Sequence, residues 1–185
     1  MQTSSSKCII TVAYSIIALV AGIFIGYRFY TYSPWYPTVH KAVAVIHPTN
    51  NNTVNGVVTF SQEKDGVHVS VTCNNLTQGK HGFHIHCFGD PRNTESFCNH
   101  FNPTKKPHGG PHSAERHVGD LGNIEADASG TAHYEFIDNV ISLNGPHSII
   151  GRSILIHAGE DDLTSQPSGN SGAKIGYGVI GITDK

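Results

Sequence analysis

The sequence lacks several features that would assign it to a class at once. Its 12 Lys and Arg and 14 Asp and Glu give a formal net charge of −2, without a basic block or an acidic tail, so nothing indicates a nucleic-acid partner. Four cysteines are too few for a disulfide-rich scaffold or for paired CxxC zinc sites. Helical periodicity is almost absent after residue 40, and no internal repeat occurs. At 185 residues, one β-rich globular domain is the simplest expectation.

One long uncharged segment lies near the N-terminus. Between Lys7 and Arg28, CIITVAYSIIALVAGIFIGY carries no charge and has the ~20 residues that a helix needs to cross a bilayer. Aromatic residues and two prolines follow it, as at a membrane interface. We expect a short tail over residues 1–7, a transmembrane signal anchor over 8–28 and an aromatic, proline-containing stalk over 29–40. A cleaved signal peptide and a buried core helix are the alternatives.

The charges that flank this segment do not set its orientation, because Lys7 is balanced by Arg28. An N-terminal anchor that also serves as the secretion signal would place the following domain outside the cytosol. Sequons at Asn51 and Asn75 agree with that placement and make both residues candidate glycosylation sites. We therefore expect a single-pass membrane protein, attached through residues 8–28, whose domain is lumenal or extracellular.

Short alternating or β-branched segments recur after residue 40 between clusters of Gly, Asn, Asp and Pro, which is typical of a β-sandwich or barrel. The expected strands are Lys41–Ile46, Gly56–Phe60, Val67–Thr72, Gly82–His86, Thr131–Phe136, Ser153–His157 and Gly176–Ile182. Two long stretches, 88–130 and 158–174, lack this pattern. Loops of that length are uncommon unless they are functional, so we expect the chemistry to lie there.

The 13 histidines are the unusual part of the composition, because histidine is the commonest metal ligand. His84 and His86 lie two apart on an expected strand, so both side chains leave the same face. The further candidate ligands are His100, His108, His117, Asp120 and His157. Imidazole suits copper and zinc, and three histidines with one aspartate close a tetrahedral zinc site. The set therefore predicts two metal ions.

Seven motifs occur in one order: GFHIH, HFNP, KKPHGGPHSAERHVGDLGN, VISL-G, IIGR, H-x(3)-DDL and GN-x-G-x(5)-GVIGI. Over roughly residues 41–183 the chain resembles the copper/zinc superoxide dismutases. The resemblance implies an all-β domain over residues 41–185, a Greek-key β-sandwich or flattened eight-stranded barrel with two long functional loops, here preceded by one transmembrane helix. It also implies dismutation of the superoxide anion to oxygen and hydrogen peroxide, with one copper and one zinc per subunit of a homodimer.

The resemblance also implies a role for each matching residue. Its copper ligands are His84, His86, His100 and His157. Its zinc ligands are His100, His108, His117 and Asp120. His100 then bridges both ions and carries a proton during catalysis, whereas Asp161 links His84 to His108 and His81 is a supporting histidine. We expect surface or structural roles for the other histidines: His40, His47, His68, His112, His133 and His147.

The chain departs from the family pattern at three places. Lys174 stands where the family has an arginine that guides the anion, and lysine keeps the charge but loses the planar fork. The loop 158–174 is short and lacks the family's Glu and Lys steering residues. The family disulfide cannot form as usual because Tyr177 lies near the place of its second cysteine. Cys87 with Cys98 is a substitute pair, and two free thiols are the alternative.

These departures define a competing function: a catalytically weak or silent dismutase-like module that binds metal or a partner. Against it stands the complete set of ligands, which a domain without copper would have no chemical need to keep. A copper-delivery protein ranks last, because the domain has no CxxC for soft Cu(I).

Overall fold

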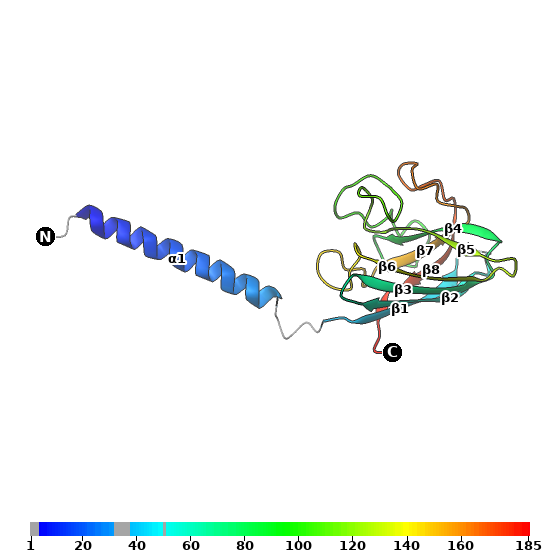
Figure 1. The fold of residues 1–185 in the computed structure, drawn as a ribbon, viewed down its shortest axis with the longest axis horizontal. Coiled ribbons are helices and arrows are strands. Elements are labelled where there is room, and N and C mark those ends of the chain that lie inside the picture. Colours follow the sequence, from blue (N-terminus) through cyan, green and yellow to red (C-terminus); the bar gives the residue numbers. More distant parts are fainter. Residues whose placement is uncertain (1–3, 32–37, 50) are drawn as a thin grey trace. The chain divides into compact units, whose positions relative to one another are not determined.

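The computed structural model describes residues 4–31, 38–49 and 51–185, in one unit that ends at Thr38 and a second from Val39 to Lys185 (Figure 1). The helix expected near the N-terminus is present as α1, Ser4–Thr31, and its side chains from Tyr14 to Arg28 are exposed. Among the described residues, however, no helix has the length and apolarity required to cross a bilayer. The transmembrane assignment of residues 8–28 is therefore not supported. The predicted tail and stalk lie partly outside the described residues.

The second unit is a nearly closed antiparallel barrel, which confirms the all-β prediction. Its strands are β1 Lys41–Pro48, β2 Asn55–Gln62, β3 Val67–Asn74, β4 Gly79–His86, β5 Asp120–Ala126, β6 Ala132–Asp138, β7 Ser153–His157, β8 Lys174–Val179 and β9 Gly181–Ile182. The first eight follow the order β5-β4-β7-β8-β1-β2-β3-β6, and the short β9 pairs with β1. Because β3 neighbours β6 and β4 neighbours β7, the connections cross the barrel as in a Greek key.

The sequence prediction missed one strand and merged two others. Strand β5 lies inside the stretch 88–130 that was expected to be a loop. Five of its seven residues are buried, including the first three in succession, so it lacks the regular alternation that marks a half-exposed strand. The strand expected over Gly176–Ile182 is divided at Ile180 into β8 and β9.

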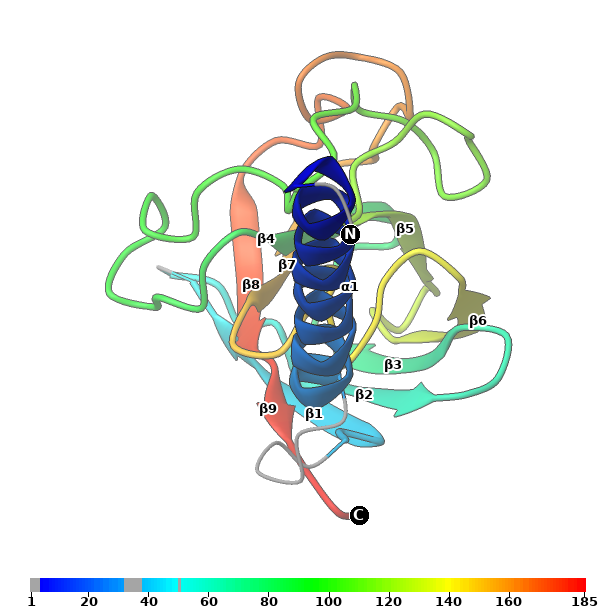
Figure 2. The same ribbon diagram turned by 90° about the vertical axis from the view of Figure 1, so that its left-hand side faces the viewer.

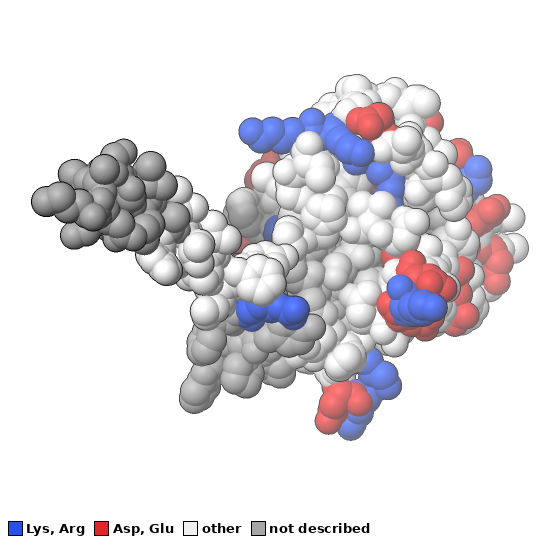
Figure 3. All heavy atoms as spheres, turned by 60° about the vertical axis from the view of Figure 1, so that its left-hand side comes forward, with Lys and Arg blue, Asp and Glu red and all other residues white. Residues whose placement is uncertain are grey.

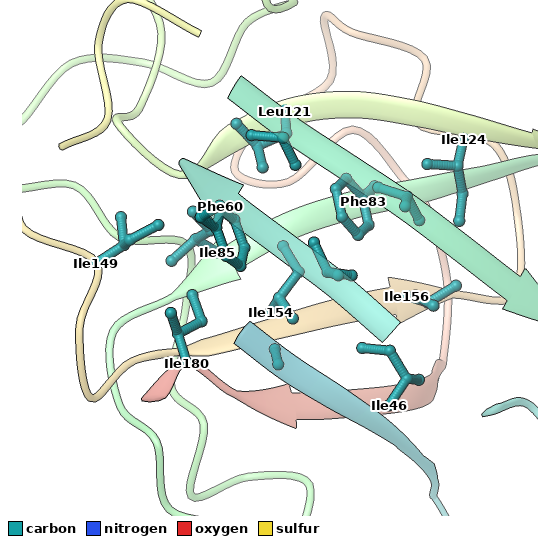
Figure 4. Close-up of a cluster of buried hydrophobic side chains, with 14 of the residues drawn as sticks. Ile46, Phe60, Phe83, Ile85, Leu121, Ile124, Ile149, Ile154, Ile156 and Ile180 are labelled. Carbon is teal, nitrogen blue, oxygen red and sulfur yellow. The ribbon is translucent and has the colours of Figure 1, made fainter. Parts of the chain in front are cut away.

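The barrel is filled by side chains that alternate inward along the strands. In β3, for example, Val67, Val69 and Val71 are buried while the residues between them are more exposed. Figure 4 shows Phe60, Phe83 and other large residues from several strands packed together in this core. This packing fixes the strand that carries two of the candidate ligands.

The two long loops lie side by side over one end of the barrel, where Figures 1 and 2 show them in green and orange. Leu163 of the second loop packs on the first: a Cβ added at Gly110 would lie 3.4 Å from its Cδ1. Segments more than forty residues apart in the sequence thus form one surface layer.

We expect Phe60→Ala to lower the free energy of unfolding by about 3–5 kcal/mol, because Phe60 is 1% exposed and its loss leaves a cavity. The neighbouring Thr59→Ala is the control, since Thr59 is exposed on the same strand. Urea denaturation of both variants measures the effect. Equal losses in the two variants would contradict this description of the core.

Candidate metal centre

The centre of the candidate site is strand β4. His84 and His86 are 0% and 2% exposed and lie between neighbouring strands, where His84 pairs with Leu155 of β7 and with Asp120 of β5. Both histidines project toward the layer formed by the two long loops. The sequence prediction that they leave the strand on one face agrees with their ring contacts to a common partner, His100.

The first loop brings His100 to this strand through a close backbone approach. Ile85 donates its N–H to Gly119 O and accepts from Phe101 N–H at 2.8 Å. A Cβ at Gly119 would lie 2.1 Å from Ile85 O, so only glycine allows the approach. The ring centroids of His84 and His100 are consequently 4.1 Å apart.

The structure gathers the seven predicted ligands into two groups that share His100. The first group is His84, His86, His100 and His157, and the second is His100, His108, His117 and Asp120. Within each group the candidate ligand atoms lie within 4.8 Å of one another, and all seven residues are buried. Residues more than seventy positions apart are therefore brought to one place, as the sequence predicted.

Five ring nitrogens in these groups are buried without a hydrogen-bond partner: His84 Nδ1, His86 Nε2, His100 Nε2, His108 Nδ1 and His157 Nε2. Leaving one such group unsatisfied costs about 1–3 kcal/mol. Their convergence is what a metal-binding site requires, because neutral imidazole nitrogens are ligands for copper and zinc. The residues therefore fit the two ions.

Asp120 organises the second group. Its Oδ1 lies 2.7 Å from His100 Nδ1 and 3.1 Å from His117 Nδ1, and its Oδ2 lies 3.0 Å from His108 Nδ1, the last pair without hydrogen-bond geometry. Burial alone would raise the pKa of this carboxyl, but hydrogen bonds from the histidines hold it far below its usual value. Three Nδ1 atoms facing one carboxylate form the N₃O donor set of a closed zinc site.

His100 belongs to both groups through opposite ring nitrogens. Its Nδ1 lies against Asp120 in the second group, and its Nε2 is buried in the first without a partner. One imidazole is thus placed to face two ions. This placement agrees with the bridging role that the resemblance implies.

Asp161 joins the two groups on their outer side. This aspartate is 1% exposed, and its Oδ2 accepts a hydrogen bond from His84 Nε2 at 2.7 Å while its Oδ1 lies 3.0 Å from His108 Nε2. Such outer partners fix the tautomer of a ligand and the orientation of its ring. The remaining nitrogen, Nδ1, of each histidine is therefore directed to its own group.

The buried histidines of the first group are held neutral. Burial lowers the pKa of His84 to about 3 and that of His157 to about 4, and it also lowers the pKa values of His86 and His100. Burial would lower the pKa of His108 too, but the neighbouring carboxylates of Asp120 and Asp161 raise it to about 9. The first group thus has free lone pairs at neutral pH, which metal binding needs.

Lys174 begins β8 directly opposite His157 in β7 and is partly exposed. Its ammonium group donates to Thr94 O at 2.8 Å, and its charge contributes to lowering the pKa of His157. The predicted anion-guiding cation therefore lies beside the first group, with one hydrogen bond to the first loop.

The other predicted residues have simpler surroundings. His81 is buried, with Nδ1 2.8 Å from His157 O and Nε2 2.9 Å from Thr77 O, which is a structural role. Asn51 and Asn75 are exposed. Cys87 and Cys98 are free thiols, so the substitute disulfide is absent and the alternative prediction of two free thiols applies. Their sulfurs are neighbours nonetheless, since a hydrogen bond with Cys98 contributes to raising the pKa of Cys87, after burial.

Three contacts that support the site were not predicted from the sequence. Asn123 pairs its carboxamide with the backbone of Asp161 through hydrogen bonds of 2.8 and 2.9 Å. Gln166 does the same with the backbone of His108. Cys98 supplies the carbonyl, 2.7 Å away, that holds His86 Nδ1. Only Asn123 lies within a quoted motif, so the sequence carried little signal for the other two.

The metal-free protein is predicted to lose stability on acidification. The folded pKa values of His84 and His157 lie below their usual 6.5, so the unfolded chain binds protons first as the pH falls. The stability that these two groups contribute is therefore complete above about pH 6.5 and is lost from there down to about pH 3, by roughly 4 kcal/mol at pH 5. Thermal unfolding at pH 7 and pH 5 measures this, and equal midpoints would contradict it.

Comparison with known proteins identifies the family. The profile of the copper/zinc superoxide dismutase family matches residues 54–180. The chain is 48% identical over 155 residues to superoxide dismutase [Cu-Zn] 2 of Mesembryanthemum crystallinum, covering 78% of this chain and 96% of the relative. It is 52% identical to superoxide dismutase [Cu-Zn] of Schizosaccharomyces pombe, covering 77% and 97%.

A third relative is the extracellular superoxide dismutase [Cu-Zn] of Brugia pahangi, which is 45% identical over 152 residues, covering 77% of this chain and 76% of the relative. The residues that match the profile, 54–180, contain strands β2 to β8 and both loops. The two groups of metal-binding side chains, the barrel that holds them and these similarities agree: the chain belongs to the copper/zinc superoxide dismutase family.

Proposed function

We propose that this chain dismutates superoxide to oxygen and hydrogen peroxide, using one copper held by the first group of residues and one zinc held by the second. The observation that carries the proposal is His100, whose two ring nitrogens lie in two separate buried groups. When bound, copper supplies the one-electron chemistry, since it alternates between Cu(II) and Cu(I), whereas zinc has no redox chemistry. Two superoxide ions and two protons yield one oxygen and one peroxide.

We assign one of the two protons to His100. Its Nε2 is buried in the first group, and its Nδ1 lies 2.7 Å from Asp120 in the second group, where zinc would hold it when bound. When Nε2 is not engaged as a ligand, it is the nitrogen that can hold a proton and pass it to reduced superoxide. The second proton comes from solvent.

The remaining assignments concern support and guidance. Asp161 and His81 keep the ligands in place, through the ring nitrogens of His84 and His108 and through the carbonyl of His157. Lys174 attracts the anion to the first group. Lysine and arginine are interspersed with acidic side chains on the face in Figure 3, so we expect little steering from the surface as a whole.

We also propose a homodimer formed by an apolar patch of Phe88, Val179 and Ile182, which are 58%, 39% and 64% exposed. Gly89, which follows Phe88 in the chain, packs against Val179: a Cβ added at Gly89 would lie 3.0 Å from Val179 Cγ1. The chemistry of the patch favours a second copy, and Val179 and Ile182 belong to the GVIGI motif. We expect Ile182→Asp to sediment as a monomer and Val57→Asp, on another exposed strand position, to remain a dimer. A dimeric Ile182→Asp would refute the proposal.

A lumenal or extracellular placement stays a proposal, supported by the exposed sequons at Asn51 and Asn75 and by the name of the Brugia pahangi relative. Glycosidase treatment of the expressed chain tests it, because removal of glycans would lower the apparent mass. Membrane attachment through residues 8–28 stays a prediction too. Resistance to carbonate extraction would support it, and release by carbonate would refute it.

The activity itself is tested by superoxide decay. We expect the chain loaded with copper and zinc to accelerate decay far more than its His86→Ala variant, which loses one buried copper ligand. Thr59→Ala serves as the control for loading and folding. A loaded wild-type chain no faster than His86→Ala would favour the competing function, a silent metal-binding module.

The role of Lys174 is tested by ionic strength. Guidance by charge raises association rates by about 10- to 1,000-fold, and we expect Lys174→Ala to lower kcat/KM by about ten-fold and to weaken its dependence on salt. Lys174→Arg should retain the rate, whereas Lys64→Ala, in the β2–β3 turn, should change neither. An unchanged kcat/KM in Lys174→Ala would refute the assignment.

A further inference from the structure

The loop 158–174 contacts His108 at two points. Asp161 holds the ring through Nε2, at 3.0 Å. Five residues later, Gln166 Oε1 accepts a hydrogen bond from His108 N–H at 2.8 Å, and Gln166 Nε2 donates to His108 O at 2.9 Å. One short segment thus forms hydrogen bonds with both the side chain and the main chain of a single candidate zinc ligand.

The geometry points to Gln166 as a positioning residue for the zinc site: its carboxamide fixes the His108 backbone so that His108 Nδ1 faces the other zinc-binding side chains. This inference rests on the proposed function, which assigns His108 to zinc. One planar amide accepts from the N–H and donates to the C=O of His108, and these two hydrogen bonds restrict both the position and the rotation of the His108 backbone.

The segment that carries Gln166 is itself braced from within. Asp162 Oδ1 accepts hydrogen bonds from Thr164 N–H at 3.0 Å and from Ser165 N–H at 2.8 Å. Its backbone N–H donates to Gly169 O at 2.9 Å, and Gly169 N–H donates to Ser165 O. None of these bonds involves a candidate ligand. The loop can therefore act as a fixed frame against which His108 is held.

The frame also lies directly on the site. At Gly169 an added Cβ would lie 2.7 Å from His108 Nε2, so the backbone covers the outer side of the pair formed by His108 and Asp161. Gln166 and Asp161 thereby fix the backbone and the ring of His108 from the same loop. The buried Nδ1 is the atom left without a hydrogen bond.

Glutamine is suited to this role because its carboxamide offers a donor and an acceptor in one plane. Glutamate keeps the acceptor for His108 N–H but loses the donor to His108 O. Methionine has a similar length and offers neither strong bond. The series glutamine, glutamate, methionine therefore removes the two hydrogen bonds in steps.

The test measures zinc affinity of the metal-free full-length chain by competition with a colorimetric chelator. Loss of outer partners of a ligand typically costs 10- to 100-fold in metal affinity, and we expect Gln166→Met to weaken zinc binding by about ten-fold, with Gln166→Glu intermediate. Thr164→Ala is the matched control, because its hydroxyl bonds only to Asp162 in the same loop. Thermal unfolding of the metal-free variants establishes that each variant folds. If Gln166→Met does not fold, zinc affinity is compared between Gln166→Glu and wild type instead.

Two further measurements separate positioning from general structural support. Cu(I) affinity of the first group should be unchanged in Gln166→Met, because the hydrogen bonds of the Gln166 carboxamide to described residues go to the backbone of His108 and Thr164, neither of which belongs to that group. The visible spectrum of Co(II) at the zinc site should change. Zinc affinity equal to wild type, or parallel loss of zinc and copper, would overturn the inference. A wild-type chain that binds no zinc would overturn the proposed function as well.

Discussion

The structure of the site depends on one constraint: in four of the candidate ligands one ring nitrogen is hydrogen-bonded to the protein, which leaves the other nitrogen for a metal ion. Asp161 holds His84 and His108 in this way, and the carbonyls of Cys98 and Gly172 hold His86 and His157. In water such rings would rotate and change tautomer. Here the hydrogen bonds choose the tautomer and the barrel supplies the low-dielectric surroundings that keep the first group neutral.

This arrangement destabilises the metal-free protein and makes the site depend on the order of the two loops. Five buried nitrogens lack partners, and residues from two loops must be ordered to bring them together. The barrel core stabilises β4 and β7, which carry three of the four histidines in the first group. The first loop provides the fourth, His100, and the two loops are held by Asn123, Gln166 and the close approach at Gly119. Metal binding and loop order are therefore expected to be coupled.

Much of this could be predicted from the sequence, for identifiable reasons. Alternation revealed strands such as β3, and the ordered motifs brought together seven ligands that spacing alone would not have joined. Strand β5 was missed because burial on both faces removes alternation. Gln166 and the Cys98 carbonyl were missed because they act through hydrogen bonds to or from the backbone, which residue type does not reveal. The apolar segment 8–28 gave a helix, but its transmembrane assignment is not supported.

The central claim is that His100 lies between two different metal ions. Anomalous diffraction from crystals of the copper- and zinc-loaded chain, collected at the absorption edges of both metals, tests it most directly. We predict two peaks per chain, with copper near His100 Nε2 and zinc near His100 Nδ1. A single peak, or two peaks that do not share His100, would contradict it.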